Sequence, residues 1–132
     1  EQQATCFGIE RHVRFTGMLS GDALREIYEK SDIAVGSLAL YRKRLSMASE
    51  LKLREYARCG LPVIVSVYDP DFEDDRYVYR VANDTSIFDL SEIIKWYHSL
   101  DLDATRRALE ELVQTRLSFT AKAGQIEVAL GL

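Results

Sequence analysis

The chain has 132 residues, 47% of them hydrophobic, with 17 basic and 21 acidic side chains and a formal net charge of -4. This length supports one ordinary hydrophobic core and is too short for two, so we expect a single domain over residues 1–132. An acidic chain whose basic segment carries no interleaved stacking aromatics argues against a nucleic-acid partner. No apolar run approaches the ~20 residues that a membrane-spanning helix needs.

The two cysteines, Cys6 and Cys59, lie far apart in the sequence and show no metal-ligand spacing. This usage fits a reducing compartment, and we expect two buried thiols in a cytoplasmic protein. Association of a full-length protein with a membrane stays open.

The first third of the chain predicts two helices and one strand. Residues 1–7 fit the end of a helix stopped by Gly8, and residues 13–16 fit a short strand closed by Gly17. Apolar residues at helical spacing then indicate an amphipathic helix that ends near Ser31.

The central part alternates strands with a helix and a turn. Continuous apolar runs predict buried strands over residues 32–38 and 61–67, and a further strand fits residues 77–82. Between the first two lie a loop over residues 39–48 and a helix over residues 50–59. The remaining apolar periodicity predicts helices over residues 90–97, 108–117 and 119–130. This order indicates an α/β fold: a three-layer, Rossmann-like parallel sheet of about four strands with flanking helices.

The helix over residues 50–59 has the clearest boundaries in the sequence. Ser49 is placed to act as its N-cap, and Gly60 can adopt the left-handed conformation that ends a helix. The free amides and positive dipole end of such a helix attract anions. Lys52 and Glu55 lie one turn apart near this end, where one can meet a phosphate and the other a pair of hydroxyls. The ordinary alternative is a solvated helix on which Glu55 pairs with a neighbouring cation.

Residues 42–58 hold six basic and two acidic side chains within an acidic chain. Cations concentrated around one helix N-terminus suggest a small anionic ligand. In the loop before the helix, Lys43 is placed to reach such a ligand, with a solvated basic loop as the alternative. We interpret Asp69-Pro70-Asp71 as turn chemistry and not as a metal site.

Three ordered motifs resemble one family. They are Ser-x-Leu-Lys-x-x-Glu-Tyr-x-x-x-Gly-x-Pro-Val-Ile from Ser49, Val-x-Phe-x-Gly from Val13, and Leu-x-x-Ile-Tyr-x-x-Ser-Asp-Ile-Ala-Val-Gly-Ser-Leu from Leu24. Together they cover most of residues 10–83 and resemble the C-terminal, donor-binding domain of retaining GT-B glycosyltransferases of group 1 (family 4).

The resemblance implies an enzyme that moves a glycosyl group from a nucleotide diphosphate sugar to an acceptor hydroxyl, in bacterial polysaccharide synthesis. It implies that Glu55 accepts hydrogen bonds from the ribose hydroxyls of the donor. It also implies that the Lys52 ammonium group and the Leu51 and Lys52 amides bind the diphosphate, with Ser49 beside that diphosphate. Lys43 is a further donor-site residue, and neither a metal nor a catalytic base is expected in this segment. One departure is Met47, where many relatives carry a glutamate that contacts the donor sugar.

The same resemblance implies that the segment is a partial domain. The family's first strands and its N-terminal acceptor domain have no counterpart here, so we expect the segment alone to be inactive and able to self-associate through an open sheet edge. Two alternatives remain: a non-catalytic nucleotide-binding or receiver-like α/β module, and a structural relic without a ligand.

Overall fold

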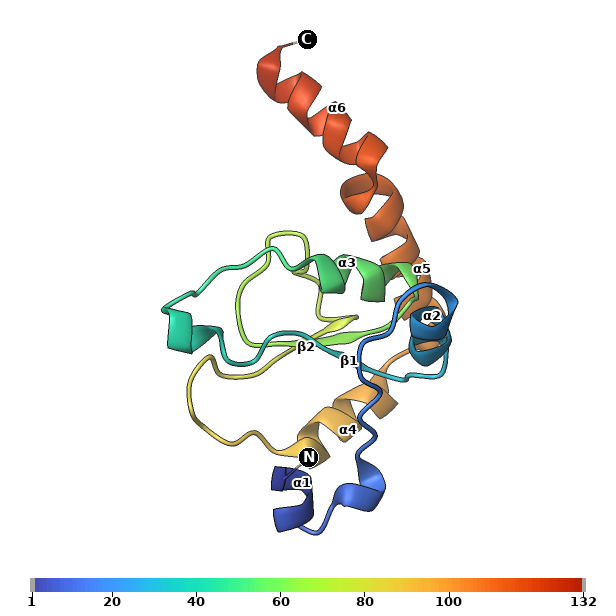
Figure 1. The fold of residues 1–132 in the computed structure, drawn as a ribbon. Helices are drawn as coiled ribbons and strands as arrows, with labels where there is room; N and C mark the ends of the chain where they lie inside the picture. The colour runs from blue at the N-terminus through green and yellow to red at the C-terminus, as the bar shows by residue number, and fades with distance from the viewer. Residues whose placement is uncertain (1, 132) are drawn as a thin grey trace. The chain divides into compact units, whose positions relative to one another are not determined.

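The computed structural model describes residues 2–131 and divides into two compact units, residues 1–30 and 31–132. Glu1 and Leu132, the outermost residues of the predicted segment, lie outside the described part. Each unit is considered by itself (Figure 1).

The first unit is helical. It contains α1 (Gln2–Cys6), the 3₁₀ turn η1 (Glu10–His12) and α2 (Gly21–Glu29). α1 and α2 confirm two predicted helices, but the strand expected over residues 13–16 is wrong: no strand of the described chain includes these residues. Val13 has extended backbone angles, φ -121° and ψ 120°. Extended, β-prone residues become a strand only when a neighbouring ladder pairs their backbone groups.

The second unit contains a parallel three-stranded sheet in the order β1 (Ala34–Val35), β2 (Val63–Val65) and β3 (Val78–Arg80). The register pairs Ala34 with Val63 and Val63 with Val78. The predicted Rossmann-like parallel α/β sheet is confirmed, with one strand fewer than expected. Within the described residues, β1 pairs with β2 on one side only.

Helices lie on both faces of this sheet (Figure 1). On one face, α3 (Leu51–Arg58) buries Leu53 and Ala57, and it also packs on α5 (Leu102–Leu112). On the other face, α4 (Leu90–Ser99) places Trp96 against Tyr79 of β3, with ring centroids 5.2 Å apart. β2 is completely buried between these layers, which is why its sequence is uninterrupted Val-Ile-Val.

The C-terminal third is a broken helical run. α5 passes into a π-helical turn, η3 (Val113–Leu117), and after Ser118 the chain continues as α6 (Phe119–Leu130), which projects away from the sheet (Figure 1). α5 begins earlier than the predicted residue 108 because the Asp101 carboxylate caps it, accepting from the Ala104 amide at 3.0 Å. Among the helices of residues 2–131, none combines the length and the apolar character needed to cross a bilayer.

Cys6 and Cys59 are both exposed, so the expectation of buried thiols is wrong. Cys59 is the C-cap of α3, directly before the left-handed Gly60 at φ +70°, and a helix end at the surface leaves its side chain in solvent.

Candidate functional site

A layer of polar side chains follows the carboxyl ends of all three strands. Ser37 comes after β1, Ser66 after β2 and Asn83 after β3. The Ser66 hydroxyl donates to the Ser37 carbonyl oxygen at 3.1 Å and lies 3.4 Å from Asn83 Oδ1. Ligands of open parallel α/β sheets bind outside this edge. We call these three residues the polar floor. They lie at the carboxyl edge of the sheet, where such a fold binds its ligands.

Glu50 joins the start of α3 to this floor. Its carboxylate accepts the Ser37 hydroxyl at 2.8 Å and the Ser37 amide at 3.2 and 3.3 Å. Glu50 is also the N-cap residue of α3, and its side chain makes no cap hydrogen bond. The prediction that Ser49 caps the helix is therefore wrong by one position. The N-terminus of α3 therefore lies beside the end of β1, at the edge where ligands of open parallel sheets bind.

Four of the predicted site residues lie at or next to the first turn of α3. Ser49, Leu51 and Glu55 are exposed, and Lys52 is partly exposed. Lys52 Nζ lies 3.4 Å from Glu50 Oε2, so its ammonium group is held at the helix N-terminus. Leu53 makes the first helical hydrogen bond, donating to the Glu50 carbonyl at 3.1 Å, which leaves the Leu51 and Lys52 amides ahead of the helical ladder.

The fifth predicted residue, Lys43, is exposed at the end of the 3₁₀ turn η2 (Leu40–Lys43). Its loop is tied to the sheet edge through Asn83, which accepts from the Tyr41 amide at 3.1 Å and donates to the Leu45 carbonyl at 2.8 Å. The role of Lys43 as a donor-site residue stays a prediction. Met47 forms an isolated parallel bridge with Tyr68, and its side chain is 58% exposed.

Burial raises the pKa of Tyr56, and the negative charges of Glu50 and Glu55 raise it further. Tyr56 therefore stays a neutral hydroxyl at physiological pH. Tyr56 follows Glu55 directly on α3, and Glu50 and Lys52 lie at the N-terminal end of the same helix.

A buried ionic cluster fixes the opposite flank of α3. Arg54 donates to both carboxylate oxygens of Asp69, to Asp71 Oδ2 at 2.7 Å and to the Glu50 carbonyl at 3.2 Å. Its guanidinium carbon also lies 5.2 Å from the centre of the Phe72 ring. Only 1% of the Asp69 side chain and 15% of the Arg54 side chain are exposed. The cluster therefore locks α3 onto the loop after β2.

Asp71 extends the cluster toward the C-terminus. Lys122 of α6 donates to its two oxygens at 3.1 and 3.2 Å, and Arg116 donates to the Pro70 carbonyl at 2.8 Å. Burial alone raises the pKa of Asp71, but the hydrogen bonds from Lys122 and Arg54 outweigh it and hold the pKa below its usual value. The Asp69-Pro70-Asp71 carboxylates are thus occupied by cations of the chain itself.

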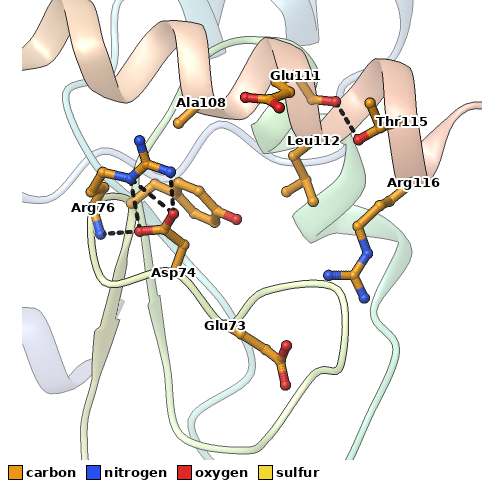
Figure 2. Close-up of a pocket in the computed structure, with 9 residues that line it drawn as sticks. Glu73, Asp74, Arg76, Ala108, Glu111, Leu112, Thr115 and Arg116 are labelled. Atoms are coloured by element: carbon orange, nitrogen blue, oxygen red, sulfur yellow. Dashed lines mark hydrogen bonds and ion pairs between the residues drawn. The ribbon is translucent and has the colours of Figure 1, made fainter.

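One hollow of the described chain lies away from these residues. It has a volume of about 450 Å³ and is lined from the loop before β3, from α5 and from η3. Asp74 and Arg76 pair across one wall, and the Thr115 hydroxyl donates to the Glu111 carbonyl on another (Figure 2). None of the five predicted site residues lines it. Because none of the residues that the sequence predicts lines this hollow, and its Asp74 and Arg76 already pair with each other, we place the candidate site at the carboxyl edge of the sheet instead.

Comparison with known families identifies the family to which this part of the chain belongs. The sequence profile described as "Glycosyl transferases group 1" matches residues 1–95. The chain belongs to this glycosyltransferase family. No curated protein and no solved structure matches it. The family match covers the polar floor, the loop with Lys43 and all of α3, so the glycosyltransferase signature and the candidate site occupy the same part of the chain.

Proposed function

We propose that this domain of a retaining glycosyltransferase binds the nucleotide diphosphate of a sugar donor at the N-terminus of α3. The observation that carries the proposal is the placement of this helix: its first turn, with Lys52, meets the carboxyl edge of the parallel sheet through Glu50 and Ser37. Free amides and a cation at that edge are suited to phosphate.

Each residue has a separate task in this proposal. The Leu51 and Lys52 amides and the Lys52 ammonium group offset the charge that develops on the leaving diphosphate. The exposed carboxylate of Glu55, one turn further along α3, accepts hydrogen bonds from the ribose hydroxyls. Ser49 lies beside the phosphate, and Lys43 approaches the donor from the loop.

The remaining parts of the reaction lie outside these residues. A separate N-terminal domain holds the acceptor hydroxyl, no metal is needed because helix dipole and ammonium group carry the positive charge, and the product is a bacterial polysaccharide made in the cytoplasm. The segment by itself is inactive in this proposal, because none of the residues 2–131 that the structure describes is assigned to activating the acceptor.

Equilibrium titration of the chain with UDP, GDP and ADP tests the proposal. We expect selective binding of one diphosphate, and Glu55→Ala to weaken it by about ten- to a hundredfold, because a hydrogen bond to a charged group contributes about 1.5–3 kcal/mol. Lys52→Met weakens binding as well. The control is Glu92→Ala on α4, whose carboxylate is exposed and pairs with Lys95.

Equal indifference to all three nucleotides overturns the proposal and favours a domain without a ligand. If a folded Glu55→Ala variant binds with normal affinity, only the proposed ribose contact is wrong, and Glu55 is a surface residue.

A further inference from the structure

We propose that Asn83 is a positioning residue of the donor site, because its side-chain amide holds the basic turn, residues 42–44, in the conformation that presents Lys43 to the donor. This inference rests on the proposed function and deepens the task given there to Lys43. Asn83 follows β3 and belongs to the polar floor, whereas the basic turn lies between β1 and α3. The sequence analysis did not single out Asn83.

The Asn83 amide bridges the two ends of the basic turn. Its Oδ1 accepts from the Tyr41 amide at 3.1 Å, directly before the turn, and its Nδ2 donates to the Leu45 carbonyl at 2.8 Å, directly after the turn. The same Oδ1 lies 3.4 Å from the Ser66 hydroxyl, which anchors the bridge in the polar floor. Asparagine is suited to this task because one planar group carries both an acceptor and donors.

The conformation of the basic turn is unfavourable by itself. Arg44 has left-handed backbone angles, φ 56° and ψ 32°, and it is the one non-glycine residue with a positive φ in the described part of the chain. Within the turn, the Arg44 amide donates to the Tyr41 carbonyl at 2.9 Å. A residue in this region of backbone space keeps its conformation only where its surroundings hold it. Asn83 supplies hydrogen bonds to the turn from a different strand end.

The basic turn also concentrates positive charge. Lys43 and Arg44 are exposed, and no carboxylate of residues 2–131 forms an ion pair with either of them. The guanidinium carbon of Arg42 lies 5.8 Å from the centre of the Tyr41 ring. Three like charges in one short turn repel each other, which favours opening of the turn until an anion binds. The bridge by Asn83 opposes this opening before the diphosphate arrives.

Holding the turn in advance raises the affinity for the donor. Without the bridge, the turn samples conformations in which Lys43 lies away from the carboxyl edge of the sheet. The apparent affinity then falls by the fraction of molecules that still have the binding conformation. The loss of one typical hydrogen bond changes this fraction about two- to tenfold.

A double-mutant cycle on the dissociation constants for UDP, GDP and ADP tests the inference, with the variants Asn83→Ala, Lys43→Met and their combination. We expect both single variants to bind the selected diphosphate more weakly, Asn83→Ala by about three- to tenfold. In the Lys43→Met background, Asn83→Ala should weaken binding by less than about twofold, because the side chain that Asn83 positions is then absent. The control is Asp84→Ala, which changes the next residue; Asp84 is exposed and accepts from the Ser86 amide at 2.7 Å, and we expect wild-type affinity.

Asn83→Ser serves as a second variant if Asn83→Ala does not fold, and urea unfolding identifies the folded variants. The serine hydroxyl keeps a polar atom near Ser66, but it is one bond shorter and cannot bridge Tyr41 and Leu45. We expect it to weaken binding as Asn83→Ala does.

Three results overturn the inference and leave the proposed function standing. They are wild-type affinity in a folded Asn83 variant, wild-type affinity in Lys43→Met, and an effect of Asn83→Ala that is as large in the Lys43→Met background as in the wild-type chain. Absence of binding to every nucleotide by the wild-type chain overturns the proposed function and the inference with it.

Discussion

Replacement of Arg54 by methionine should strongly destabilise the domain. The substitution keeps much of the side-chain volume but removes the hydrogen bonds that Arg54 donates to Asp69 and Asp71. Asp71 retains Lys122, whereas Asp69, with 1% of its side chain exposed, keeps a single donor, the Asp71 amide at 3.0 Å. A buried charge left without its partner costs about 3–5 kcal/mol.

A loss of this size is a large fraction of the stability of a small domain, which is about 5–15 kcal/mol. Urea unfolding followed by far-UV circular dichroism and by fluorescence of Trp96, the single tryptophan, measures it. The control is Arg76→Met, whose side chain is 62% exposed and paired with Asp74; we expect a change below about 1 kcal/mol.

The double variant Arg54→Met/Asp69→Leu separates the two contributions to this loss. Because the orphaned charge is removed, the double variant should recover part of the stability that Arg54→Met loses. If Arg54→Met costs no more than Arg76→Met, or if the double variant is as unstable as the sum of its parts, the assignment of Arg54 as the ionic anchor of α3 is wrong.

Three further outcomes are expected. The folded pKa of Asp71 lies below its usual 3.8, so its contribution to stability is present well above that value and is lost as the pH falls through the folded pKa; Asp71→Asn should flatten the acid limb of the unfolding free energy plotted against pH, and an unchanged limb contradicts this. Gly36→Ala should cost about 1–3 kcal/mol, because the new Cβ lies 3.2 Å from the Ile64 carbonyl oxygen, and a neutral result in urea unfolding refutes that crowding. Gly124→Ala adds a Cβ with no atom within 4 Å and improves the helix propensity of α6 by up to about 1 kcal/mol; circular dichroism should therefore show a higher helix content.

The features predicted correctly from the sequence are those with local causes. The helix expected over residues 50–59 is observed as α3, and Gly60 ends it at φ +70° because only local backbone geometry decides a helix stop. The apolar run after Gly60 forms the buried strand β2, which β1 and β3 pair on its two sides. The strand over residues 13–16 failed because a strand also needs a partner that its own residues do not specify.

The polar contacts of the site were not predictable in the same way. Glu50 meets Ser37 across 13 residues, and Arg54 meets Asp69 across 15, so no helical or strand spacing relates the partners. A signal was present in hindsight: Asp69 and Asp71 flank a proline directly after the apolar run of the buried strand, and buried acids at such a position need cations. The sequence predicted an anion site at the start of α3, whereas only the fold showed that the Glu50 carboxylate lies there and is held by Ser37.

The projecting helix α6 has a consequence for how the domain opens. Phe119, Val128 and Leu130 are 96%, 81% and 67% exposed, and the ion pair of Lys122 with Asp71 joins the helix to the loop after β2. A segment with so little buried apolar surface separates from the rest in a subglobal step at low free energy. Amide hydrogens of α6 should therefore exchange well before those of α5, and the cooperative unit that a denaturant melts ends near η3.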